Sequence, residues 1–156
     1  MTDVNPLDTI VTLITTNYDN SNTDSVTPLV AKIYEKPLAK EPRPGEDFIF
    51  VYGMTTQRAS RGMNGNNKAE IIEPLRIDIR VRTSNTAQNS KTDDTHARKV
   101  RGEVDRILYN NILTPGSGFD NIDPNMEVQD LSNGSRGIFR YVYTVRLNDW
   151  CRDMTL

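Results

Sequence analysis

Residues 74–83 read PLRIDIRVRT and have the clearest secondary-structure pattern in the chain. From Leu75 to Val81, apolar side chains alternate with arginine and aspartate. A period of two residues is typical of a β-strand that buries one face and leaves the other on a surface. The segment therefore predicts a half-buried strand with an apolar inner face and a charged outer face.

Four more strands are expected around this one. Residues 28–36 have one apolar face, and residues 47–54 (DFIFVYGM) are apolar on both faces, which favours a strand inside the sheet. Near the end of the chain, residues 125–131 and 137–149 predict a hairpin. The two arms should be joined through SNGSRG at 132–137, in which Asn133-Gly134 is the dipeptide typical of two-residue hairpin turns. The long polar stretch between the second and third strands, residues 55–73, should be a loop.

Two amphipathic helices complete the pattern. Asn5 is a suitable N-cap before Pro6, and the helix should end near Asn17. The second helix should be capped by Thr92 or Asp93. Apolar residues at helical spacing form one face of each helix: Leu7, Ile10, Val11 and Ile14 in the first, and Ala97, Val100, Val104, Ile107 and Leu108 in the second.

The predicted order is α-β-β-β-α-β-β, which indicates an α+β fold: a mostly antiparallel sheet with two helices packed on one face. A chain of 156 residues with 36% hydrophobic residues is the size of one domain, so residues 1–156 should form a single core.

The composition gives little support to an enzyme or a cofactor site. The single cysteine, Cys151, excludes an intrachain disulfide and a cysteine-rich zinc cluster, and His96 is the only histidine. The glycine-rich stretches fit no phosphate-binding loop. We expect neither a signal peptide nor a membrane span, because no run approaches 18 apolar residues.

One enzyme class remains as an alternative. The same element order occurs in restriction-endonuclease-like nucleases, which hold magnesium with an acidic residue on one strand and a (D/E)-x-K motif on the next. The motif position would be Asp78-Ile79-Arg80, with Asp47, Glu70 or Glu73 as the acidic partner. Arginine is a poor substitute for the lysine because it stays protonated. A simpler interpretation gives Asp78 cross-strand ion pairs on a solvated or interface face.

The charges are unevenly distributed although the net charge is only −2. Residues 57–106 contain eleven Lys/Arg and seven Asp/Glu, and the rest of the chain is acidic. This pattern is either ordinary solvated surface or a heterologous interface, in which a basic face of one copy meets an acidic face of the next. The candidate interface residues are Arg58, Arg61, Lys68, Arg76, Arg80, Arg82, Asp120, Asp123 and Glu127.

Four segments together resemble a known family. They are the opening helix Asn5–Thr16, the strand LRIDIRVRT, the segment THARKVRGEVDRILYNNIL and the terminal GIFRYVYTVRLNDW. In the order of its elements and in its residue patterns, the chain resembles the tail-terminator (tail-completion) proteins of long-tailed bacteriophages and the related head–tail joining proteins.

The resemblance implies a virion structural protein of the tail or neck, made in the host cytoplasm, without enzymatic activity, metal or cofactor. It implies a homo-oligomeric ring, commonly a hexamer, that caps the tail tube and joins it to the head-side connector or stopper protein. DNA would pass through such a ring without sequence-specific binding, and a sheath is a further candidate partner. A head–tail adaptor or stopper is the alternative within this class, and a nuclease or nucleic-acid-binding domain is the alternative outside it.

Overall fold

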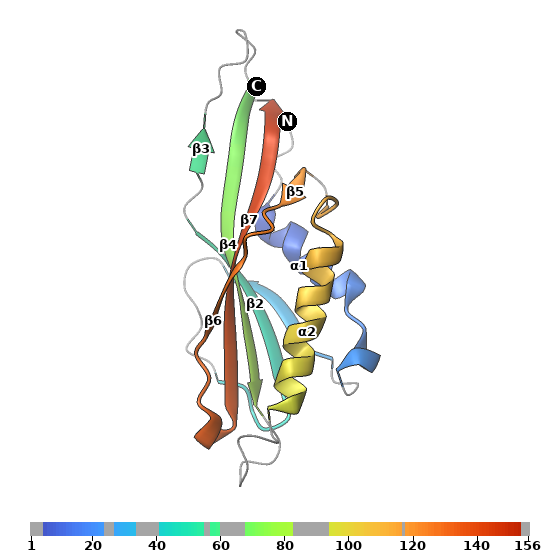
Figure 1. Ribbon diagram of the computed structural model, residues 1–156, viewed down its shortest axis with the longest axis vertical. Helices are drawn as coiled ribbons and strands as arrows, with labels where there is room; N and C mark the ends of the chain where they lie inside the picture. Colours follow the sequence, from blue (N-terminus) through green and yellow to red (C-terminus); the bar gives the residue numbers. More distant parts are fainter. Residues whose placement is uncertain are drawn as a thin grey trace.

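Two long paired strands form the centre of the computed structural model (Figure 1). The structure describes residues 5–23, 27–33, 41–54, 57–59, 68–82, 94–116 and 118–153, with the backbone alone at 57–59, 68–69, 135 and 151–153. In chain order the elements are α1 (Pro6–Asn17), the 3₁₀ turn η1 (Asn20–Asn22), β1 (Leu29–Ile33), β2 (Asp47–Gly53), β3 (Gln57–Ala59), β4 (Lys68–Arg82), α2 (Thr95–Asn110), β5 (Asn121–Ile122), β6 (Glu127–Asp130), the 3₁₀ turn η2 (Gly134–Arg136) and β7 (Ile138–Asp153).

The described strands form one sheet in the order β1-β2-β4-β7-β5, with β3 also paired to β4 and β6 also paired to β7. Only β1 and β2 run parallel, and the other described pairs are antiparallel. Figure 1 shows α1 and α2 on the same face of this sheet. The predicted α+β class is therefore confirmed, and the short strands β3 and β5 add to the expected order.

The core lies between the two helices and the sheet. On α2 the predicted stripe is buried completely, and it belongs to one cluster with the inner face of β4 (Leu75, Ile77, Ile79 and Val81). The α1 cap is also confirmed, because the Asn5 side chain accepts a hydrogen bond of 2.9 Å from the backbone N–H of Leu7. At α2 the residue before the helix is Asp94, while Thr92 and Asp93 lie outside the described residues. Neither described helix is long and apolar enough to cross a bilayer.

The prediction of a loop over residues 55–73 is wrong in part. β3 occupies Gln57–Ala59, and β4 already begins at Lys68. β4 pairs with β7 along nearly its whole length, so cross-strand hydrogen bonds override the polar composition of this stretch. Pro74 is tolerated because its backbone faces the gap between β2 and β3, where its carbonyl accepts a hydrogen bond from the N–H of Met54.

The C-terminal hairpin and its connection through residues 132–137 are confirmed, but the predicted two-residue turn at Asn133-Gly134 is wrong. The bridge from Asn133 to Ile138 encloses the turn η2 instead of a two-residue Asn-Gly connection. The left-handed backbone conformation is taken by Gly137, with φ of 66°, so the residue needed to reverse the chain lies three positions beyond Gly134.

Candidate subunit interface

The outer face of β4 carries a buried cluster of charges. Asp78 has no exposed surface, and its carboxylate accepts hydrogen bonds from Arg80 and Arg140. The Nη2 atoms of both arginines lie 2.9 Å from Oδ2, and Nε of Arg140 lies 3.1 Å from Oδ1. The hydrogen bond to Asp78 raises the pKa of Arg140 above its usual value, although partial burial opposes this. Asp78 thus forms the expected cross-strand ion pair, with Arg140 on β7, but its expected solvated or interface position is wrong, because it is buried between two arginines of the same chain.

This geometry does not suit the nuclease alternative. Both carboxylate oxygens of Asp78 are occupied by guanidinium groups. In the sheet Asp47 is paired with Val81, and Glu73 is paired with Leu147. Both carboxylates therefore lie on the helix-covered face of the sheet, whereas Asp78 lies on the other face. Glu70 is about 25 Å away along the strand, at roughly 3.3 Å per residue. Within the described ranges no three His, Cys, Asp or Glu residues are grouped to hold a metal ion.

His96 has a structural partner. Its Nε2 atom lies 2.7 Å from Oδ2 of Asp47, whose side chain is almost fully buried. The pair joins the first turn of α2 to the start of β2. This arrangement accounts for the residue without a catalytic role.

A second buried carboxylate ties α2 to the segment after α1. Glu103 accepts hydrogen bonds from the backbone N–H of Asp19 at 3.0 Å and from the side chain of Asn22 at 2.8 Å, and it is paired with Arg106. Burial raises the pKa of Glu103, but the hydrogen bonds from Arg106, Asp19 and Asn22 outweigh it, so the pKa lies below its usual value. From the sequence, Glu103 is only one of the charged residues around the apolar face of the second helix, so its buried position was not predicted.

The predicted basic interface residues have separate environments. Arg76 is exposed on the outer face of β4, whereas Arg80 is buried against Asp78 and unavailable to a partner. Arg82 is half-buried, with Nη1 3.4 Å from the carbonyl oxygen of Pro42. Only the backbone of Arg58 (β3) and Lys68 (β4) is described, and Arg61 lies outside the described residues.

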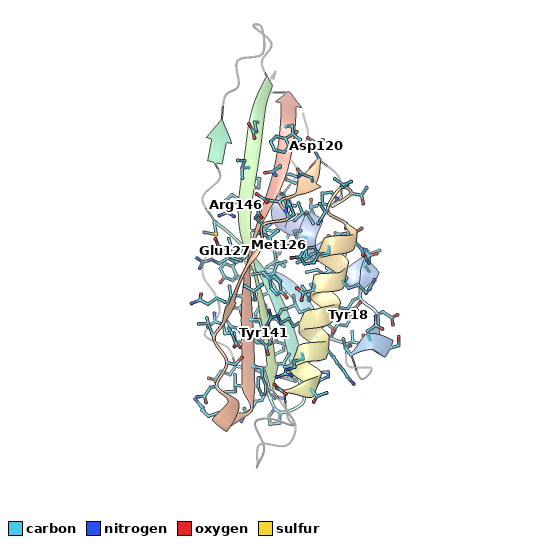
Figure 2. All side chains as sticks on the ribbon, viewed as in Figure 1. Tyr18, Asp120, Met126, Glu127, Tyr141 and Arg146 are labelled. Carbon is cyan, nitrogen blue, oxygen red and sulfur yellow. The ribbon has the colours of Figure 1, made fainter. Side chains whose placement is uncertain are left out.

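Arg146 is a basic surface residue that the prediction omitted. It lies on β7 opposite Pro74, on the same outer face as Arg76, and Figure 2 shows it on the side of the sheet away from α2. The alternation of residues 137–149 already places Arg146 on the polar face of this strand, opposite to its apolar face. Met54 adds an exposed apolar side chain beside these arginines, since its N–H binds the Pro74 carbonyl. We call Met54, Arg76 and Arg146 the arginine surface.

The three predicted acidic residues do not form one group. Glu127 is exposed on β6 opposite Thr144, which places it on the outer face with Arg146 (Figure 2). Asp120 and Asp123 flank β5 instead. The carboxylate of Asp120 accepts a 2.7 Å hydrogen bond from the backbone N–H of Trp150, and that of Asp123 accepts one of 2.9 Å from Asn125.

Large apolar side chains are exposed next to Asp120 and Asp123. Leu113 in the turn after α2 is 79% exposed, and Tyr109 near the end of α2 is 52% exposed. Trp150 is also 50% exposed, but it contacts Asp120 through its backbone N–H. The N–H of Ile122 donates to the carbonyl of Ile112 at 2.7 Å, which brings this turn against β5. We call Tyr109, Leu113, Asp120 and Asp123 the acidic end surface.

An open groove of about 450 Å³ lies between α1 and the turn after α2. It runs between the threonines of α1, at positions 9, 12 and 16, and the residues Asn111, Thr114 and Pro115.

No protein-family model and no curated protein sequence matches the chain. Among solved structures, the chain is similar to one from the virion of a native gene transfer agent (GTA) particle, with a TM-score of 0.51, 11% identity and 92% of each chain covered. It also aligns with a chain of an extracellular contractile injection system, described as PVC sheath/tube terminator in extended state, with a TM-score of 0.36 and 11% identity. That alignment covers 97% of this chain and 60% of the other. The fold of this protein is therefore one that also occurs in a phage-like virion.

Proposed function

We propose that this protein is a virion structural protein of the tail-terminator type, which forms a ring on the end of the tail tube and joins it to the head-side connector. The observation that carries the proposal is the shared fold with a chain of the GTA virion over 92% of both chains. The element order, the alternating strand and the two helices on one face agree with the tail-terminator resemblance of the sequence.

The surface chemistry supports assembly rather than catalysis. The segment of residues 107–135 is acidic, because it contains four carboxylates and no Lys, Arg or His. It also carries four of the exposed large apolar side chains: Tyr109, Leu113, Val128 and Leu131. Such surfaces are stabilised when a partner covers them, as in a ring of identical subunits. In this proposal the partners are other copies of the chain, the tail tube protein and a connector or stopper protein, and DNA passes through the ring without sequence-specific contacts.

The proposal is tested by deleting the gene from the genome that produces the particles and examining the products by electron microscopy. A terminator should be required for tails of uniform length, so we expect heads without attached tails and tails of irregular length. A plasmid copy of the gene should restore joined particles. Tails of normal length that fail to join would favour a head–tail adaptor, and normal joined particles would refute both functions.

The ring is tested separately by native mass spectrometry of the purified protein. A hexamer of the 17.7 kDa chain should appear at about six times the monomer mass. A protein that stays monomeric over the whole concentration range, alone and with tail tubes, would contradict the ring.

A further inference from the structure

We infer that the acidic end surface of one subunit binds the arginine surface of a second copy, so that the subunits join head to tail. This inference rests on the proposed function, because it assigns the two surfaces through which the ring would form. It differs from the sequence prediction, which placed Arg80, Arg82 and Glu127 in the interface.

The acidic end surface has the composition of a binding site. Tyr109 and Leu113 are each more than half exposed, and aromatic side chains are frequent among the residues that dominate binding energy. The carboxylates of Asp120 and Asp123 accept backbone hydrogen bonds but form no ion pair with any described residue. An apolar centre with charges beside it matches the general anatomy of protein interfaces.

The arginine surface supplies the complementary basic side chains, with the exposed Glu127 at its edge, opposite Thr144. Arg76 is exposed, Arg146 is half-buried, and neither forms an ion pair with a described residue. Met54, which is 41% exposed, supplies an apolar contact beside them. The register places the three together, because Pro74 is paired with Arg146 and its carbonyl binds the N–H of Met54.

The two surfaces cannot satisfy each other within one chain. Figure 2 shows Asp120 and Arg146 on opposite sides of the β4–β7 pair, and the arginines lie on the sheet face away from the helices. Complementary charges on two different sides of one molecule favour a heterologous contact between copies. Because each bound copy keeps one surface unoccupied, the contact repeats from copy to copy, which forms a ring when the rotation between neighbours closes.

Two variants test this pairing. The first, Leu113→Lys with Asp120→Asn and Asp123→Asn, makes the acidic end surface basic while both asparagines keep an oxygen that accepts the native backbone hydrogen bonds. The second, Arg76→Glu with Arg146→Glu, makes the arginine surface acidic. Control variants are Glu41→Lys and Arg136→Glu, at exposed positions outside both surfaces.

Assembly is measured by sedimentation velocity over a range of concentrations, with circular dichroism to establish that each variant is folded. Each triple or double variant alone should need about a hundredfold higher concentration for half-assembly, and the controls should behave as the wild type. An equimolar mixture of the two variants should regain assembly, since every contact then joins opposite charges.

Variants that assemble as the wild type would overturn the assignment of the two surfaces, and so would a mixture that stays dissociated. If the double arginine variant is unfolded, the single variant Leu113→Lys tests the inference instead. The Leu113 side chain is 79% exposed and can be replaced without loss of core packing. The single variant should weaken assembly about tenfold, and unchanged assembly would overturn the inference. A wild-type chain that never assembles would instead overturn the ring, and the inference with it.

Discussion

Replacing Asp78 by alanine should destabilise the native protein by about 3–5 kcal/mol, the cost of removing one partner from a buried ion pair. Asp78 has no exposed surface, and the side chain of Arg80 is only 7% exposed. Without the carboxylate, the Arg80 guanidinium would lose its ion pair with Asp78 at a position shielded from water. The loss of the carboxylate would cost less free energy at Arg140, because its side chain is 30% exposed and can turn to solvent.

Urea unfolding followed by circular dichroism measures this loss. In a protein of this size the thermal midpoint should fall by about 6–20 °C. The matched control is Arg76→Ala, on the same strand and face but exposed, which should change the free energy of unfolding by less than about 0.5 kcal/mol. A second variant, Asp78→Leu with Arg80→Met, removes both charges and should recover most of the stability.

A loss below about 1 kcal/mol in Asp78→Ala would refute the reasoning. A double variant no more stable than Asp78→Ala would also refute it, because the penalty would then come from lost packing and not from the broken ion pair.

Four further substitutions test the packing and electrostatics. Val104→Asp should cost about 3 kcal/mol or more in thermal or urea unfolding, because it places a carboxylate in the core between α2 and the sheet; unchanged stability would show that α2 buries another face. Gly102→Ala should stabilise the exposed side of α2 by about 0.5–1 kcal/mol, since a Cβ there meets no atom within 4 Å. Gly116→Ala should destabilise by about 1–2 kcal/mol, because φ is +137° and the Cβ would lie 3.0 Å from Thr9; equal effects of the two glycine variants would contradict this. Folding lowers the pKa of Glu103, so its charge stabilises the native state above pH 4.5, and this stabilisation is lost as the pH falls through the lower pKa of the folded state. The stability of Glu103→Gln should therefore fall less steeply on acidification, as urea titrations from pH 6 to about pH 3 would measure.

Periodicity predicted the main elements because both helices and the central strands bury one continuous apolar face. The same rule failed on the other face of β4, where alternation only separates apolar from charged positions. It cannot distinguish a charge in water from one enclosed by neighbouring strands. Asp78 is enclosed because β7 brings Arg140 next to it from a distant part of the chain, and this pairing partner is not encoded locally.

The candidate interface was predicted less completely, for the same reason. Arg76 and Asp120 were recognised and are exposed, but Arg146 joins Arg76 only through the β4–β7 register. Leu113 and Trp150 had no pattern that marked them as exposed, because single apolar residues at the ends of elements are usually assigned to the core. Locating such residues needs the three-dimensional arrangement of α2, β5 and β7.

The pairing of β4 with β7 has a consequence for biosynthesis. β4 leaves the ribosome before its main partner exists, since α2, β5 and β6 must be made first. At about 5–20 residues per second, the chain from the end of β4 to the end of β7 takes about 4–14 seconds to synthesise. During this interval β4 has an apolar face and an open edge, so the nascent chain should depend on chaperones. A messenger truncated before Ile138 should yield an insoluble product, even though it encodes both helices and every described strand except β7.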